Sequence, residues 1–322
     1  MCSGDKEERL IKIIIPGPLT TVQDAGRTGY MAQGFPVCGA ADADSMEIGN
    51  ILVGNAPDTA VLEITLGGFA AEFLSDSVVA VTGADAPFFI NGVPLERYRA
   101  YPLKKRDYIY VGPVKSGCRI YLCVSGGIST EPFMGSRSTF LKIGMGGYKG
   151  RKLMPGDMLP MGYVPKMPKK LGSRSVVPPE FSSTVTLRAT VGPQDNMFSP
   201  EEIDKFFSSE YTVTPASDRM GIRLDGPFLN SLNGTDIISD GIACGSVQIP
   251  SDGKPIILCA DRQTTGGYAK PVTVISADMP KAGQLVPGNK VRFVRVTQEE
   301  AYKAAIERSR YIKKLSKKLH RL

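Results

Sequence analysis

The sequence predicts a mainly β protein, and its composition is the first reason. The 35 glycines and 24 prolines are spread along all 322 residues, which favours many short strands joined by tight turns over long helices. From Ala60 onward apolar residues recur at every second position, as in Ile120, Leu122 and Val124. Turn residues follow at intervals of about ten residues. This pattern is typical of an antiparallel barrel or sandwich.

A repeated segment supports the same fold. Residues 103–109, 153–159 and 285–291 each begin with Leu and read as strand, tight turn, strand. Two of the three carry Pro-Gly at the central positions of a type II turn. In addition, Asn91-Gly92 predicts a type I′ hairpin.

The chain is long enough for two domains, and its second part begins much as the first does. A 42% hydrophobic content allows two cores. Strands over residues 11–15 and 184–191 both lead into a Gly/Pro turn. The expected order is a polar tail (1–10), a first β domain (11–164), a linker rich in Pro, Lys, Ser and Gly (165–180), a second β domain (181–296) and a basic amphipathic helical tail (297–322).

Only a few helices are expected. One covers residues 45–53 and ends at Gly54-Asn55-Ala56-Pro57. Another begins at the capping box formed by residues 297–300 and forms the tail, which we expect to dock on a partner or on nothing. The apolar positions of this tail are Ala301, Ala305, Ile312, Leu315, Leu319 and Leu322.

Charge and cysteine usage exclude several classes of function. Eight Lys/Arg against three Glu give residues 297–322 a charge of +5, which leaves only +2 of the total +7 for the rest of the chain. A basic body that binds nucleic acid is therefore not expected. The six cysteines form no CxxC pair and His320 is the only histidine, which argues against a metal site and against a histidine-based triad.

The same residues bear on the cellular compartment. Cys123, Cys244 and Cys259 lie in or beside apolar runs, so we interpret them as buried reduced thiols. The N-terminal segment is polar, and the apolar run that follows it stops at Pro16. We therefore expect no signal peptide, no membrane span and a cytoplasmic protein.

The stretch 245–268 is the strongest candidate for a site. An apolar run over residues 255–260 predicts a buried strand that ends directly in Asp261-Arg262. We expect Gly266 and Gly267 to turn through positive φ and to bring backbone N–H groups close to a ligand. A polar hairpin turn is the alternative. The candidate site residues here are Gln263, Thr264, Gly266, Gly267 and Tyr268.

Two segments of the first half offer further candidates. Gln23, Asp24 and Arg27 occupy a loop rich in hydrogen-bonding groups; they line a site, or they tie the loop together with Asp24 paired to Arg27. Small residues surround Arg137, so its guanidinium can reach a carboxylate or phosphate with two hydrogen bonds. An ordinary ion pair is the alternative for Arg137.

In the second half, Asp218, Arg219 and Arg223 form a compact charged segment. Asp218 can act as a base, and the two arginines can bind an oxyanion or a carboxylate. Structural ion pairing is the competing interpretation. No stretch matches the phosphate loop GxxxxGK[ST].

Longer motifs indicate a family. The segments PGPLTTVQDAGRTGY, PVCGAADADSMEIGN, LEITLGGF, SGGI, GSRSTF, PGD, SDRMGIRLDGP, GSVQIPSDGKPI and DRQTTGGY occur here in order, over about residues 11–296. In these motifs the chain resembles the biotin-dependent carboxyltransferase-like family, also called allophanate hydrolase subunit 2. The Kip antagonist and the C component of 5-oxoprolinase are members.

The resemblance implies two cyclophilin-like β-barrel domains and a role in a complex. The implied partners are the B component of 5-oxoprolinase, which is a relative of the Kip inhibitor, and its A component. Together they are expected to open 5-oxoproline (pyroglutamate) to L-glutamate with ATP and Mg bound by the complex, and this chain is expected to be inactive alone. The resemblance assigns no individual roles; we expect Arg219 or Arg137 to bind the anion, with Asp24, Asp218, Gln263, Thr264 and Tyr268 around the reacting group. Gln23, Arg27, Arg223, Gly266 and Gly267 complete the expected substrate site.

Two other functions fit the resemblance. A carboxyltransferase would move a carboxyl group from carboxybiotin to urea or a related amide, although this chain has no Met-Lys-Met segment to which biotin is attached. A non-catalytic antagonist would bind and sequester the Kip inhibitor, which regulates a histidine kinase.

Overall fold

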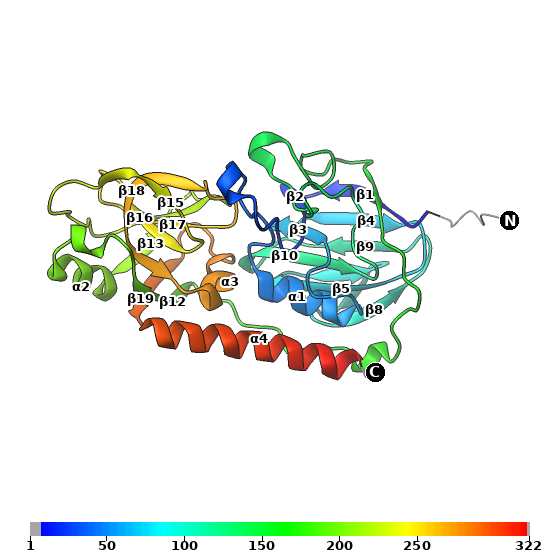
Figure 1. Cartoon of the computed structure of the whole chain (residues 1–322). Coiled ribbons are helices and arrows are strands. Elements are labelled where there is room, and N and C mark those ends of the chain that lie inside the picture. The colour runs from blue at the N-terminus through cyan, green and yellow to red at the C-terminus, as the bar shows by residue number, and fades with distance from the viewer. Residues whose placement is uncertain (1–7, 321–322) are drawn as a thin grey trace.

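The computed structural model describes residues 8–320. These residues form 19 strands and four α-helices, which confirms the predicted mainly β fold. Figure 1 shows two β units side by side, with the long helix α4 (Gln298–His320) running beneath both of them.

The first half consists of two antiparallel sheets that enclose one core. The strand order is β11-β1-β4-β9-β6-β7 in one sheet and β2-β3-β10-β5-β8 in the other. Phe69 and Ile109 from the first sheet pack with Leu62 and Ile120 from the second. The strands are β1 (Leu10–Pro16), β2 (Leu19–Gln23), β3 (Val61–Thr65), β4 (Phe69–Phe73), β5 (Ser77–Asp85), β6 (Phe88–Ile90), β7 (Val93–Leu95), β8 (Ala100–Leu103), β9 (Tyr108–Val111), β10 (Ser116–Val124) and β11 (Met158–Pro160).

The second half closes into a barrel. Its strand order is β12-β19-β13-β14-β17-β16-β18-β15, and a further pairing of β12 with β18 closes seven of these strands, so that β15 alone extends from the barrel. β12 and β19 are parallel, with Thr184 opposite Lys290. The strands are β12 (Thr184–Val191), β13 (Glu210–Val213), β14 (Gly221–Asp225), β15 (Asp236–Gly241), β16 (Ser246–Ile249), β17 (Ile256–Leu258), β18 (Thr265–Val274) and β19 (Lys290–Arg295).

The repeated segment forms the same turn each time. Arg106, Gly156 and Gly288 occupy the third turn position with φ of 76°, 86° and 90°, the left-handed value that a type II turn requires. In each turn a side chain at the fourth position accepts the backbone N–H of the first; these side chains are Asp107, Asp157 and Asn289. The positive φ of Asn91 and Gly92 between β6 and β7 likewise confirms the predicted hairpin.

Both predicted helices are present. α1 (Ala43–Leu52) begins two residues earlier than expected because the carboxylate of Asp42 accepts the N–H of Ser45 and caps it. The capping box of α4 is confirmed, since the N–H of Thr297 donates to Glu300 and the N–H of Glu300 donates to the Thr297 hydroxyl. The remaining helical segments are η1 (Met31–Gln33), η2 (Leu141–Ile143), η3 (Leu171–Ser173), η4 (Asp195–Met197), α2 (Pro200–Ser208), η5 (Ser276–Asp278) and α3 (Met279–Ala282).

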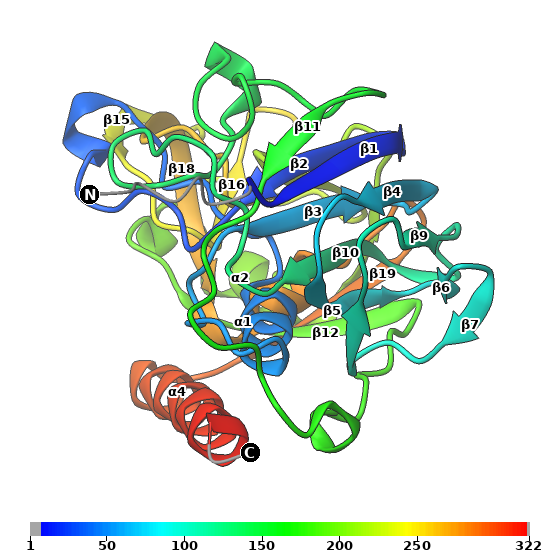
Figure 2. The ribbon, with the colours of Figure 1, turned by 90° about the vertical axis from the view of Figure 1, so that its right-hand side faces the viewer.

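Helix α4 docks on its own chain, so the expectation of a tail that meets a partner or nothing is wrong. Figure 2 shows α4 beneath α1, and the buried Ile312 and Leu319 pack into the apolar cluster that α1 shares with β10. Ala304 is buried as well, whereas Ala301 and Ala305, two of the expected apolar positions, are half-buried. Leu322 lies outside the described residues.

Arg174 joins the ends of the two helices. It lies within the predicted linker (165–180), whose boundaries stay a prediction, and its guanidinium is almost fully buried. It donates to the carbonyl oxygens of Ile51 and Leu52 at the end of α1 and to that of Leu319 at the end of α4. Arg174 therefore supplies hydrogen-bond donors to carbonyl oxygens that lack a partner within their own helix. These oxygens lie at the C-termini of α1 and α4, where positive charge is favourable.

Candidate functional site

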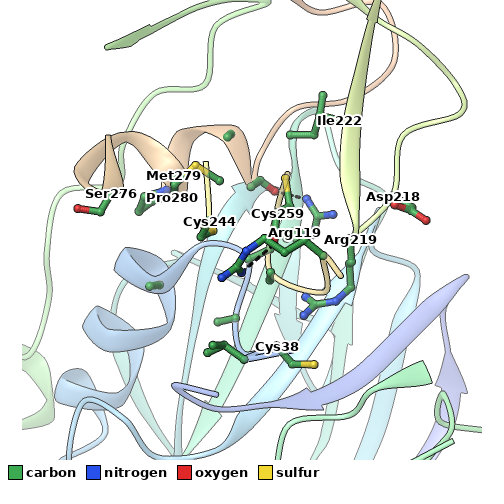
Figure 3. Close-up of a pocket in the computed structure, with 18 of the residues that line it drawn as sticks. Cys38, Arg119, Asp218, Arg219, Ile222, Cys244, Cys259, Ser276, Met279 and Pro280 are labelled. Atoms are coloured by element: carbon green, nitrogen blue, oxygen red, sulfur yellow. Dashed lines mark hydrogen bonds between the residues drawn. The ribbon is translucent and has the colours of Figure 1, made fainter. Parts of the chain in front are cut away.

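A cavity of about 280 Å³ lies where the two halves meet. Its wall from the first half comes from residues 37–43 and β10, and its wall from the second half comes from β14, the residues that follow β17, and α3 (Figure 3). Much of the surface is apolar or sulfur. Four arginines also line it, and they are Arg119, Arg219, Arg262 and Arg308.

Arg219 is held by two buried carboxylates. Its Nε and Nη2 donate to Asp261 at 2.9 and 2.8 Å, and its Nη1 donates to Glu63 on β3. Burial opposes the charge of Arg219, but the carboxylates of Asp261 and Glu63 raise its pKa well above the ordinary value. These contacts support the competing interpretation of Arg219, which is structural ion pairing.

Glu63 extends this network into the first half. It accepts the hydroxyl of Tyr121 at 2.8 Å and the N–H of Ala41 at 2.9 Å, and Arg119 Nε lies 3.6 Å from its Oε1. Burial by itself would raise the pKa of Glu63, but Arg219 and Arg119 bring it below the ordinary value. The network (Glu63, Arg119, Arg219 and Asp261) thus joins the two halves through charge.

Asp42 lies beside this network and caps α1. Its carboxylate accepts Gln284 Nε2 at 2.7 Å and the hydroxyl of Ser45 at 2.6 Å. Burial raises the pKa of Asp42 to about 6 despite these hydrogen bonds. The second half therefore contacts the start of α1 through a carboxyl group that titrates in mildly acidic solution.

Arg262 differs from the other three arginines of the cavity. Arg119 and Arg219 share Glu63, Arg219 also pairs with Asp261, and Arg308 pairs with Asp44 and Glu47. Arg262 is only 6% exposed. It donates to the carbonyl oxygens of Ile242 at 3.1 Å and Cys259 at 3.2 Å, and its Nη2 lies 3.9 Å from the sulfur of Met31. Within residues 8–320 no carboxylate forms an ion pair with it.

Three cysteines also border the cavity, and Figure 3 labels them as Cys38, Cys244 and Cys259. Burial raises the pKa of Cys38 and of Cys259 to about 12 in each case, so both thiols stay protonated and poorly nucleophilic near neutral pH. Cys244 is exposed, because it lies in the turn before β16, and its assignment as buried was wrong. The five cysteines within the described residues form no disulfide.

The loop candidates of the first half do come together. The Asp24 carboxylate accepts the hydroxyls of Ser136 and Ser138 at 2.6 Å each, and it also accepts the N–H of Arg137. No ion pair joins Asp24 to Arg27 in the described part of the chain, so the pairing assumed in that alternative is wrong, although these residues do tie the loop together. Arg27 instead donates to the Ser138 carbonyl oxygen, and its guanidinium lies 5.6 Å from the Phe133 ring centre.

The other two residues of this group are also anchored. Gln23 is buried and donates to the Thr139 carbonyl oxygen at 3.3 Å, and its own Oε1 has no hydrogen-bond partner among residues 8–320. Arg137 is half-buried and donates through Nε to the Thr130 carbonyl oxygen at 2.7 Å. Both side chains therefore stabilise the backbone of the loop that follows β10.

Asp218 and Arg223 do not join Arg219. Asp218 lies at the rim of the cavity, where its Oδ1 accepts the N–H groups of Met220 and Gly221 at 2.8 and 3.1 Å. It stabilises the turn before β14. Arg223 lies on the exposed face of β14 and is not among the residues that line the cavity.

From Thr265 onward the chain runs along β18, and Gln263 and Thr264 lie in the short connection before it. The prediction of positive φ at Gly266 and Gly267 was wrong, because both are in the strand and Gly266 pairs with Asp240 of β15. Close packing explains the glycine at 266, since a Cβ there would lie 2.7 Å from the side chains of Gln248 and Ile242. Gln263 and Tyr268 are exposed and Thr264 is half-buried, and none of them lines the cavity.

Sequence reasoning missed Glu63 and Arg119 as site residues, and it placed Asp261 and Arg262 at the end of the buried strand without giving them a role. A signal was available for the first two. Each is a single charged residue in an otherwise apolar strand, VLEIT and CRIYLC, and a buried charge needs a partner. Asp261 and Arg262 lie inside the stretch 245–268, at the end of its apolar run, where a buried charge could equally have been expected.

The described residues contain neither a metal-binding cluster nor a membrane-spanning helix. Between residues 8 and 320, no group of three or more His, Cys, Asp or Glu side chains is arranged to hold a metal ion. No helix in the same range is long and apolar enough to cross a membrane.

Comparisons with known proteins agree on the family. Residues 33–295 match the family described as carboxyltransferase domain, subdomain A and B. The chain is 38% identical to the C subunit of 5-oxoprolinase from Escherichia coli strain K12, over 97% of this chain and 99% of that protein. It is 32% identical to urea amidolyase of Lachancea kluyveri, over 95% of this chain but only 18% of that protein.

A solved structure extends the comparison to the fold. The crystal structure of the Kluyveromyces lactis urea amidolyase matches 97% of this chain with a TM-score of 0.90 and 31% identity. The matched part is 20% of that longer chain. The arrangement of sheets, barrel and inter-half junction therefore recurs as one portion of a larger enzyme.

Proposed function

The chain belongs to the family of the carboxyltransferase domain, subdomains A and B, and on that premise we propose that it is the C subunit of an ATP-dependent 5-oxoprolinase. One observation carries the proposal. The match to the 5-oxoprolinase C subunit of Escherichia coli covers 99% of that protein, whereas the match to urea amidolyase covers 18%. The first match is therefore to a whole protein, whereas the second is to one part of a much longer protein.

The proposed reaction opens the lactam of 5-oxoproline to L-glutamate together with the A and B components of the enzyme. A lactam carbonyl is a poor electrophile, so phosphoryl transfer from ATP to its oxygen would make it open to attack by water. ATP and Mg would be bound by the complex, and this chain alone would be inactive. The substrate carboxylate calls for an arginine, since a guanidinium binds a carboxylate with two parallel hydrogen bonds.

The site residues divide by position in this proposal. Arg219 is committed to Glu63 and Asp261, so we assign it to holding the two halves in register and not to substrate. Gln23, Asp24, Arg27 and Arg137 form one cluster in the first half. Gln263, Thr264 and Tyr268 follow Arg262 in the chain, in and just before β18.

The test is glutamate release from 5-oxoproline with Mg-ATP. The chain is mixed with the A and B components, and each of the three proteins is then omitted in turn. We expect release only from the complete mixture. Absence of glutamate from a mixture that size-exclusion chromatography shows to be assembled would refute the proposal.

Carboxyl transfer is the second candidate, and the structural match to urea amidolyase favours it. In that case the chain would move a carboxyl group from carboxybiotin, supplied by another protein, to urea or a related amide. Labelled carboxybiotin with urea as acceptor tests it directly. Transfer of label without any glutamate release would select this function over the first.

A further inference from the structure

The inter-half cavity carries a buried positive charge that the described protein does not neutralise. Three of its four arginines have carboxylate partners, whereas Arg262 bonds only to two carbonyl oxygens and a thioether. An isolated buried charge is unfavourable unless it is paired. An anion that entered the cavity would remove this penalty.

The guanidinium of Arg262 also has donors to spare. It carries five N–H bonds. Three are directed at Ile242, Cys259 and Met31, and the last of these contacts, at 3.9 Å to a thioether sulfur, is a weak one. The remaining N–H groups on Nη1 and Nη2 match the two oxygens of a carboxylate.

The rest of the cavity suits a small organic molecule. Its volume of about 280 Å³ is close to the lower end of the range for small-molecule sites. Val37, Ile222 and Met279 supply apolar walls, which exclude water and strengthen an ion pair at Arg262. The other arginines of the lining are already paired, so they contribute shape without competing for the anion.

We propose that this cavity binds a small carboxylate and that Arg262 is the residue that receives the carboxylate group. 5-Oxoproline is the ligand that we expect, and this part of the inference rests on the proposed function. Binding of the carboxylate by the Arg262 guanidinium does not depend on which reaction follows.

Titration calorimetry on the full chain tests the inference. The ligands are 5-oxoproline, acetate and glutamate, with 2-pyrrolidone as the same lactam ring without a carboxylate. We expect at least one of the carboxylates to bind and 2-pyrrolidone to fail. Arg262→Met should weaken the binding about tenfold or more, and Arg262→Lys should weaken it less.

A matched control is Arg310→Met on the exposed side of α4, which should leave the affinity unchanged. The rise in melting temperature that each ligand gives the unmodified chain supplies a second measurement that needs no variant. Failure of every carboxylate to bind, equal binding by Arg262→Met, or equal binding of 2-pyrrolidone would each overturn the inference. Glutamate release by the complete three-protein mixture is measured separately, so the proposed function is tested independently of carboxylate binding.

Discussion

Arg219 and Arg262 line the same cavity and are buried to the same degree, at 7% and 6% exposure, yet within residues 8–320 only Arg219 has carboxylate partners. Asp261 precedes Arg262 directly in the chain, but its side chain pairs with Arg219, which lies 42 residues earlier. Two equally buried arginines therefore have different tasks. One fastens the halves together, and the other is left for a ligand.

The largest expected effect comes from removing the paired arginine. Arg219→Met leaves the buried carboxylates of Glu63 and Asp261 without their partner, so we expect the free energy of unfolding to fall by about 3 to 5 kcal/mol. Arg262→Met leaves only two carbonyl oxygens without a donor and should cost clearly less. Urea unfolding of both variants measures the difference. Equal losses of unfolding free energy would contradict the different roles assigned to Arg219 and Arg262.

The pH dependence of stability tests Asp42, a buried carboxyl group that forms no ion pair within the described residues. The folded pKa of Asp42 is raised from 3.8 to about 6, so its contribution to stability is full below about pH 4 and is lost as the pH rises through 6. The stability of the natural chain relative to Asp42→Asn should thus fall by up to roughly 3 kcal/mol between pH 4 and 7.

Asparagine keeps the capping acceptor of α1, so the helix itself stays in place. Thermal or urea unfolding of both proteins across this pH range gives the difference directly. A difference that does not change with pH would mean that Asp42 titrates normally.

Arg174 sharpens the comparison, because it too is buried against carbonyl oxygens and has no carboxylate partner among the described residues. Burial lowers its pKa. Arg174→Met should destabilise the chain by about 1 to 3 kcal/mol, since three carbonyl oxygens at the helix ends lose their donor. Hydrogen exchange should speed up mainly in the last turns of α1 and α4; uniform exchange along the chain would contradict a local role.

Arg308 should give the smallest effect. Its ion pairs with Asp44 and Glu47 are partly exposed, so Arg308→Gln should cost about 1 kcal/mol or less, and raising the salt concentration should shrink this cost further. A salt-independent loss as large as that of Arg219→Met would remove the distinction between buried and exposed pairs.

Features set by nearby residues were predictable from the sequence. The three type II turns, the Asn91-Gly92 hairpin and the capping box of α4 each depend on two to four consecutive residues. Helix α2 was missed, although Ser199 followed by Pro200 and two glutamates is a clear start signal. Its signal is as local as the others, so this helix too was within reach of the sequence.

Pairings across long distances were not predictable in the same way. Asp24 bonds to Ser136 and Ser138, and Glu63 bonds to Arg219, at sequence separations of more than 100 residues. The motifs identified which segments carry polar groups but not which of them meet. The strand assignment of Gly266 and Gly267 depends on β15, whose irregular sequence gives little alternation to detect.

Helix α4 has a mechanical consequence for the cavity. Its 23 residues, a rod of roughly 35 Å, contact η5 and β12 at one end and α1 at the other, and Arg174 fastens the far end. A hinge rotation that separated the halves would have to pull this rod off one of its two anchors. We therefore expect a ligand to enter the cavity between two halves whose separation stays fixed.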